Sequence, residues 1–354
     1  MEVIFLNEQN LDVKDHAICT DDFEIVLDAL IPQKSKFSVA KHSLNVEISD
    51  LLVVRDGGYF YVGIITSISF DNNNLTKIET QDYLSILDVE VPLPQSFTGN
   101  LGNFLYRIIE ENYKTSTDAY QNISYLDISV EAYKQVTLSY DVDTKENILD
   151  LIEEFSKTHG IRVCYDIVIE NGKFSKIKLR IVESDIGIKI KAGLGIITDL
   201  VVNDINENSL NKVIFLPKSD NEQYHGTVIY YLQTNGTITT ESVLALRFPK
   251  VKFKYEYYSD KDYPNLLTKA TKLLIDSSLK HNITFNFSFF KNKIDYLSDL
   301  KIGTFVEFLS NDKVYETIVT KMVYKGTLNV AEITLGEYRV SLTDKLKLLD
   351  RRKA

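Results

Sequence analysis

The feature that most constrains the fold is a run of strand, tight turn, long strand, turn and strand that occurs twice. Residues 52–70, LVVRDGGYFYVGIITSISF, align without a gap on residues 306–324, VEFLSNDKVYETIVTKMVY. The turns coincide, since Asp56-Gly57-Gly58 falls on Ser310-Asn311-Asp312, and both triplets carry residue types that favour tight turns. After one extra residue in the second copy, a third strand follows each hairpin, LTKIETQDYL in the first and LNVAEITLGEY in the second.

Two explanations of this repeat stay open. Any two β-hairpins of this composition could align about as well, or the chain contains an internal duplication, which the matched turns favour. A duplication implies two related barrels, and a trimer of such chains would present six similar barrels in a ring. The candidate ring-forming hairpins are then marked by the three identical aligned pairs, which are Tyr61 and Tyr315, Ile64 and Ile318, and Thr66 and Thr320.

The first ninety residues read as successive short strands. The segments with partial two-residue alternation are 23–30, 44–54, 59–70 and 75–84. Turn residues separate them, above all Asp56-Gly57-Gly58 and Asp71-Asn72-Asn73-Asn74. The 21 Tyr and 18 Phe residues also favour strands. A meander of this kind closes most easily into a small barrel or a two-layer sheet.

The pattern changes after Pro92 and Pro94, and residues 96–186 read as a compact α+β unit. A helical stripe begins at Leu101, and a second helix carries a stripe from Ile148 to Phe155. For the second helix we predict a capping box of Asp143 and Glu146 and a stop at Gly160. Strands are expected between the two helices, at 125–130 and 136–140, and at the end of the unit, at 162–169 and 174–182.

Strand patterns return from about residue 187. They are expected at 196–205, 211–217, 226–232, 250–258, 283–290, 304–309, 315–324 and 329–335, with a helix over 265–279. In the segment KVKFKYEYY, lysines alternate with aromatics, which predicts a strand with one apolar and one solvated face. The terminal Arg351-Arg352-Lys353 is expected to be a solvated basic tail.

Several classes of function lack support in the sequence. The net charge of -10 is unlike that of a dedicated nucleic-acid binder. Cys19 and Cys164 are too few for a disulfide framework or a thiolate metal site, and the five histidines are scattered. No window approaches 18 consecutive apolar residues, so no membrane span is expected. We find no catalytic, nucleotide-binding or metal-binding motif, and we predict no enzyme, no cofactor and no metal site.

The residues that carry a family resemblance are 297–347, around the second hairpin, and 65–93, at the exit of the first. Both segments resemble baseplate hub proteins, also called tail-tip or tail-associated proteins, of long-tailed bacteriophages of the siphophage type. These proteins are related to the two-barrel trimeric hub of contractile tails. The resemblance follows the element order over most of the chain.

This resemblance implies a mainly β fold with α+β insertions, in which two related antiparallel β-barrels accompany two smaller α+β domains. The expected domains are 1–95 for the first barrel, 96–186 for the α+β domain, 187–235 with 296–345 for a split second barrel, 236–295 for an inserted α+β domain and 346–354 for the tail.

It further implies a homotrimer at the virion tail tip, assembled in the bacterial host cytoplasm. The trimer would close the tail tube, adapt six-fold to three-fold symmetry and open for DNA ejection. The expected partners are a hexameric distal tail protein, receptor-binding proteins and a tape-measure protein, with DNA present only in transit.

Two other functions stay open from the residues alone. A receptor- or glycan-binding module is favoured by the aromatic segments KFKYEYY and FNFSFF, and disfavoured by the absence of Trp. A cell-wall-degrading enzyme would need a pair of carboxylates, and no pair among the 50 Asp and Glu residues can be singled out.

Overall fold

The protein is described by a computed structural model. The described residues are 1–29, 33–40, 43–55, 59–70, 75–140, 142–183, 188–204, 210–218, 225–233, 237–243, 245, 252–278, 281–289 and 300–336. The expected turns at 56–58 and 71–74 and the expected tail at 346–354 lie outside them.

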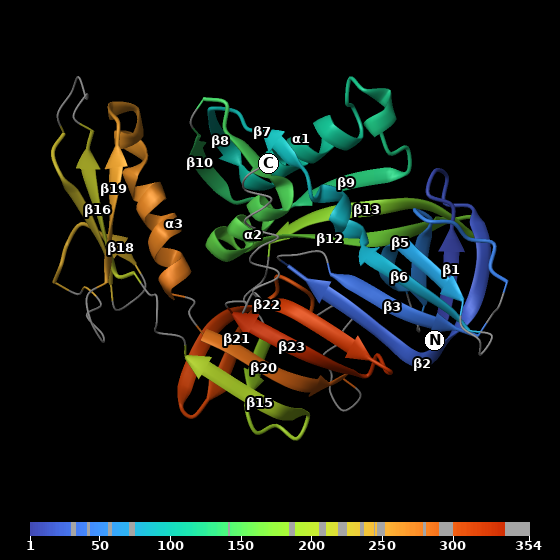
Figure 1. Cartoon of the computed structure of the whole chain (residues 1–354). Helices are drawn as coiled ribbons and strands as arrows, with labels where there is room; N and C mark the ends of the chain where they lie inside the picture. The colour runs from blue at the N-terminus through green and yellow to red at the C-terminus, as the bar shows by residue number, and fades with distance from the viewer. Residues whose placement is uncertain are drawn as a thin grey trace. The chain divides into compact units, whose positions relative to one another are not determined.

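The chain is mainly β, as the sequence predicts, and its first six strands form a closed antiparallel barrel (Figure 1). The strand order is β1-β4-β5-β6-β3-β2, and a further pairing of β1 with β2 closes the ring. In β4 all four residues from Leu51 to Val54 are buried, because one face of the strand lines the barrel and the other is covered by the next part of the chain. The strands are β1 (Glu2–Leu6), β2 (Val13–Asp28), β3 (Lys34–Val39), β4 (Leu51–Arg55), β5 (Tyr59–Phe70) and β6 (Thr76–Asp82).

The covering part is an α+β region between residues 83 and 183. Two helices lie in it, α1 (Leu101–Tyr113) and α2 (Ile148–His159), and its three-stranded sheet has the order β12-β13-β9. Apolar residues of both helices share one core with outward-facing barrel residues such as Val53 and Val62. The remaining elements are η1 (Tyr83–Leu87), β7 (Glu90–Pro92), β8 (Ser96–Asn100), η2 (Ala119–Gln121), β9 (Leu126–Glu131), β10 (Gln135–Ser139), β11 (Lys145–Asn147), β12 (Ile161–Glu170) and β13 (Lys173–Glu183).

The start of α2 differs from the prediction, whereas its end agrees. Asn147 is the N-cap, and its side chain accepts a hydrogen bond from the backbone N–H of Leu149 at 2.9 Å. The predicted box of Asp143 and Glu146 is wrong, because Glu146 lies in strand β11 opposite Val91 and the helix begins only after it. Gly160 ends the helix with φ 67°, a left-handed conformation that glycine adopts without steric cost.

A second set of six strands repeats the order of the first around β22 (Figure 1). The order is β14-β21-β22-β23-β20-β15, which corresponds to β1-β4-β5-β6-β3-β2. One difference is that β14 runs parallel to β21, whereas β1 runs antiparallel to β4. The strands are β14 (Ile188–Lys191), β15 (Ile197–Asp204), β20 (His281–Ser288), β21 (Phe305–Ser310), β22 (Lys313–Lys325) and β23 (Val330–Gly336).

A separate four-stranded sheet, of order β18-β17-β16-β19, has a small core of its own with helix α3. Its elements are β16 (Lys212–Pro217), β17 (Val228–Leu232), β18 (Ile238–Thr239), β19 (Phe253–Tyr258), η3 (Asp260–Asn265) and α3 (Leu266–Ser278). Residues 201–283 form most of one compact unit, and most of the rest of the chain forms another.

These pairings differ from the expected boundaries of the second barrel. We expected residues 187–235 in that barrel, but β16 and β17 pair with β19 and β18. Conversely β20, expected in the inserted domain, is a neighbour of β23 and β15. The alternation of a strand shows which face is buried, and it does not show which strand lies beside it. The domain boundaries as such stay a prediction.

Candidate functional site

The two hairpins marked in the sequence have the same pairing register. At a shift of 254 residues, four of the five pairs of β4 with β5 fall on pairs of β21 with β22, and the exception is Arg55 with Tyr59, where the register of β4 on β5 shifts. Leu51 lies opposite Ile64 as Phe305 lies opposite Ile318, and Val54 lies opposite Tyr61 as Phe308 lies opposite Tyr315. In the third strands the shift becomes 255, because Ile65 lies opposite Thr80 and Val319 opposite Leu335. The extra residue expected in the second copy is therefore present.

The turn that precedes each hairpin is also repeated. Ser49 and Gly303 have φ 81° and 77°, and their N–H groups donate to Ile65 and Val319 at 2.9 and 2.8 Å. The residue that follows, Asp50 or Thr304, accepts a side-chain hydrogen bond from the backbone N–H three residues earlier, at 2.7 and 3.1 Å. A left-handed non-glycine residue is uncommon, so its match to a glycine at the same place indicates a common structure.

Thr66 and Thr320 mark a β-bulge in each long strand. The register of β5 on β6 skips Thr66, and that of β22 on β23 skips Thr320. Each threonine hydroxyl donates to a carbonyl across the bulge, to Glu79 and to Thr334, at 3.2 Å in both cases. Bulges bend a strand locally, so both long strands bend at the same residue, with the same bond.

The other four marked residues lie inside the hairpins and are mostly buried. Tyr61 is inaccessible to solvent and bonds the hydroxyl of Thr80 at 2.9 Å. Ile64 is half-buried and Ile318 is buried. Tyr315 is 7% exposed and lies 4.4 Å from the ammonium of Lys313, measured to the ring centroid. These side chains are packed inside the protein at the hairpins. Their role in ring formation stays a prediction.

Beyond the bulge, β22 joins the two strand sets within one chain. Residues 24–28 of β2 pair antiparallel with residues 321–325 of β22. Opposite charges face each other at both ends of this joint. Asp28 lies 3.8 Å from Lys321, with a fully buried carboxylate, and Glu24 lies 3.7 Å from Lys325, where both side chains are exposed. The charges fix the register, because a slip by one residue would break both pairs.

Sequence reasoning missed this joint, although a signal was present. The segment Glu24–Asp28, EIVLD, has an acid at each end, and Lys321–Lys325, KMVYK, has a lysine at each end. In an antiparallel pair of equal length, such segments match at both ends. Alternation predicts that both segments are strands, but it does not indicate which strand each one pairs with.

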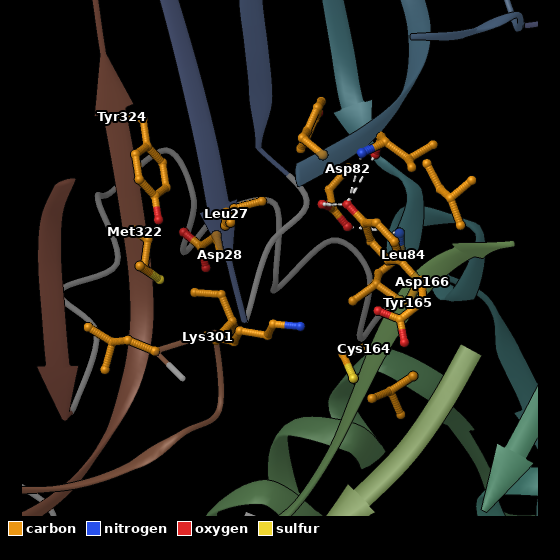
Figure 2. A pocket seen from close by; sticks show the side chains of 16 residues that line it. Leu27, Asp28, Asp82, Leu84, Cys164, Tyr165, Asp166, Lys301, Met322 and Tyr324 are labelled. Atoms are coloured by element: carbon orange, nitrogen blue, oxygen red, sulfur yellow. Dashed lines mark hydrogen bonds between the residues drawn. The ribbon is translucent and has the colours of Figure 1, made fainter. Parts of the chain in front are cut away.

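A cavity of about 420 Å³ lies beside the joint (Figure 2). Its walls come from three parts of the first unit: β2 and β5 of the barrel, β12 of the α+β region, and β22 of the second strand set. Met322 and Tyr324 stand on the β22 wall, and Tyr165 and Asp82 stand on the other side (Figure 2).

Asp82 holds the barrel to the α+β region at this cavity. Its carboxylate accepts hydrogen bonds from the N–H of Leu84 at 2.8 Å and from the hydroxyl of Tyr165 at 3.0 Å. The Tyr165 oxygen also accepts a bond from the N–H of Val62 at 3.2 Å. Burial raises the pKa of Asp82 to about 6, against the effect of its hydrogen bonds. The carboxyl group therefore changes charge within the range of mildly acidic media.

The thiol of Cys164 also lines the cavity. Burial raises the pKa of the Cys164 thiol, so the thiol is protonated at neutral pH and is a poor nucleophile. Burial likewise raises the pKa of Cys19 to about 11. Over the described ranges, we find no cluster of three His, Cys, Asp or Glu residues that could hold a metal ion. Nor does that part of the chain contain a helix with the length and apolar character needed to span a bilayer.

Comparison with known proteins connects the fold to phage tails. No family profile matches the chain, and no curated protein sequence does. Among solved structures, the prophage tail protein gp18 of Listeria monocytogenes is similar, at 14% identity and a TM-score of 0.56, with complete coverage of both chains. The 43 kDa tail protein of prophage MuSo2 from Shewanella oneidensis has 12% identity and a TM-score of 0.55, and the match covers 95% of this chain and 98% of that one.

A third similar structure comes from an assembled particle. It is a chain of the phage P2 baseplate in its activated conformation, with 13% identity and a TM-score of 0.50, and the match covers 96% of this chain and 100% of that one. The chain therefore shares its fold, over nearly its full length, with phage tail and baseplate proteins.

Proposed function

We propose that the chain is a structural hub of a phage tail tip, without enzymatic activity, and that three copies assemble into a ring. The observation that carries this proposal is the duplication within one chain: the same turn, register and bulge recur at a shift of 254 residues. Two similar strand sets per chain give six similar units in a trimer. Six similar strand sets in such a ring would fit a tube of six-fold symmetry, although the ring of three chains has only three-fold symmetry.

In this role the trimer would close the tail tube, seat on a hexameric distal tail protein and open when DNA is ejected. It would lie at the virion tail tip after assembly in the host cytoplasm. The fold shared with phage tail and baseplate proteins supports the tail part of this proposal. The net charge of -10 supports the passage of DNA, since acidic walls repel phosphate.

The oligomeric state of the purified full-length chain tests the proposal. We expect sedimentation velocity to give a particle of three chains of 40.5 kDa each, and negative-stain averages to show a ring with six similar lobes. A chain that stays monomeric or dimeric at every concentration would contradict the hub function.

A receptor- or glycan-binding module is a second candidate, because an aromatic row is exposed on β19. Phe253, Tyr255 and Tyr257 are 49%, 55% and 67% exposed. We expected the aromatic face of this strand to be its buried one. That expectation is wrong, because α3 and the small core lie on the other face, where Tyr258 is buried. Binding on a glycan array that is lost in Tyr257→Ala would favour this function.

A further inference from the structure

The joint inside one chain provides a template for a joint between chains. Within the chain, β2 stands last in the strand order of the first set. It pairs with the part of β22 that follows the bulge. Ile25, Val26 and Leu27 lie opposite Tyr324, Val323 and Met322, between the two charge pairs. Because the second set repeats the first, each set has both an edge like that of β22 and a strand like β2.

The edge that corresponds to β22 lies on β5. At the shift of 254 residues, Lys321–Tyr324 falls on Ser67–Phe70, directly after the bulge at Thr66. Two of the three apolar positions are kept, with Ile68 for Met322 and Phe70 for Tyr324, whereas Ser69 replaces Val323. Ser67 replaces Lys321, so the charge is not repeated. Ser67–Ser69 pair with β6 on one side, and within the described part of the chain no second strand pairs with them. Phe70 is 61% exposed, whereas Tyr324 is fully buried.

The strand that corresponds to β2 is β15. It neighbours β20 and then β23, as β2 neighbours β3 and then β6. A matched hydrogen bond supports the correspondence of the two strands, since the N–H of Ser288 donates to Ile196 at 2.9 Å and that of Ala40 donates to Ile18 at 3.2 Å. This bond lies before the register irregularity of β2 between Cys19 and Phe23, so it identifies the strand and does not fix the register of residues 24–28.

Its sequence repeats the β2 segment as well. Residues 199–203, DLVVN, keep the order of an acid, three aliphatic residues and a polar residue found in EIVLD. Val26, the central residue of the β2 segment, is 6% exposed where β2 pairs with β22, whereas Val201 is 51% exposed. An apolar strand edge of this kind pairs readily with another chain.

We propose that β15 of one copy pairs antiparallel with residues 67–70 of β5 in a second copy, so that Val201 lies opposite Ser69 as Val26 lies opposite Val323. This inference rests on the proposed trimeric hub and identifies its contact between subunits. The interface is heterologous, because two different edges meet, and it closes into a ring when the rotation allows. Three of these joints would alternate with the three joints inside the chains. Burial of Val201 and Phe70 would add apolar stabilisation.

Disulfide trapping in the full-length chain tests the register. Residues directly opposite each other in an antiparallel pair have Cβ atoms about 5 Å apart, near the range that a disulfide requires. We expect a mixture of Ser69→Cys and Val201→Cys chains to form a covalent heterodimer on mild oxidation. Each variant alone and the wild type, with Cys19 and Cys164 only, are the controls and should not cross-link.

A charge in the joint tests the same contact by assembly. We expect Val201→Glu to raise the dissociation constant of the trimer at least tenfold, because the carboxylate would be buried in the joint. Val243→Glu is the matched control, since Val243 is 84% exposed outside any strand, and it should assemble as the wild type does. Circular dichroism of both variants verifies that each one folds.

The outcomes separate the two proposals. A wild-type trimer in which Val201→Glu still assembles and the cysteine pair does not react would overturn the strand pairing and leave the hub function standing. A wild-type chain that never forms trimers would overturn both.

Discussion

At the scale of single residues, Asp82 shows the effect of burying a carboxyl group where the barrel contacts the α+β region. The carboxylate lies between the barrel and the α+β region and is bonded by Leu84 and Tyr165. Its pKa rises from 3.8 to about 6 mainly because it loses contact with water. The folded protein therefore binds this proton more tightly than the unfolded chain does.

We predict from this shift that stability falls as the pH rises. The contribution of Asp82 is complete below the unfolded pKa of about 4 and is lost as the pH increases through about 6. The free energy of unfolding should drop by an amount on the order of 3 kcal/mol over this interval. Asp82→Asn should remove this slope in urea titrations between pH 4 and 7, whereas the exposed Glu8→Gln should keep it. An unchanged slope in Asp82→Asn would contradict the assignment.

The sequence could not have indicated this residue. Asp82 precedes an ordinary short helix, and its partner Tyr165 lies 83 residues further along the chain. A pKa shift depends on which groups tertiary contacts bring together, and local alternation contains no such information.

At the scale of elements, the joint of β2 with β22 allows a comparison of two ion pairs. Asp28 with Lys321 is shielded from solvent, with side-chain exposures of 0% and 24%, whereas Glu24 with Lys325 is open, at 42% and 64%. The same strand pair therefore contains one buried and one exposed pair, at opposite ends.

We predict that the two lysines contribute unequally to stability. Lys321→Ala leaves the buried carboxylate without its lysine and should lower the free energy of unfolding by about 3 kcal/mol. Lys325→Ala should change it by less than 1 kcal/mol, because exposed pairs contribute little. Chemical denaturation of both variants measures the difference, and equal losses would contradict the greater contribution of the buried pair.

The hairpins are the elements that the sequence predicted best. Turn residues and alternation placed β5 and β22 within two residues of their observed ends, because local chemistry determines both features. The strand partners of β16 and β20 could not be predicted, since many pairings satisfy one buried face. The repeated bulges at Thr66 and Thr320 had a visible signal in the identical threonines, but threonine is common in regular strands too.

At the scale of the whole molecule, the chain contains two compact units with cores of their own. Residues 201–283 form most of the smaller one, where Leu266, Ala270 and Leu274 of α3 pack on the sheet of β16 to β19. Separate cores allow separate unfolding, so one free energy need not describe the chain.

We predict that a change in α3 affects one unit alone. Leu274 is fully buried, and Leu274→Ala should destabilise the smaller unit by about 2–5 kcal/mol. Leu267 lies on the same helix and is 49% exposed, so Leu267→Ala should have an effect below about 0.5 kcal/mol. Calorimetry should show one transition moving to lower temperature in Leu274→Ala while the other stays in place. A shift of the entire profile would indicate a single cooperative unit.

The joint of β2 with β22 would also affect the kinetics with which the proposed ring forms. Two separate proteins that meet must give up translational and rotational freedom, but these strands belong to one chain and meet at an effective concentration that the polypeptide itself sets. A six-unit ring built from three linked pairs needs two encounters in solution before it closes, whereas one built from six single units needs five. The linked ring would therefore form at lower protein concentration and would have fewer incomplete intermediates.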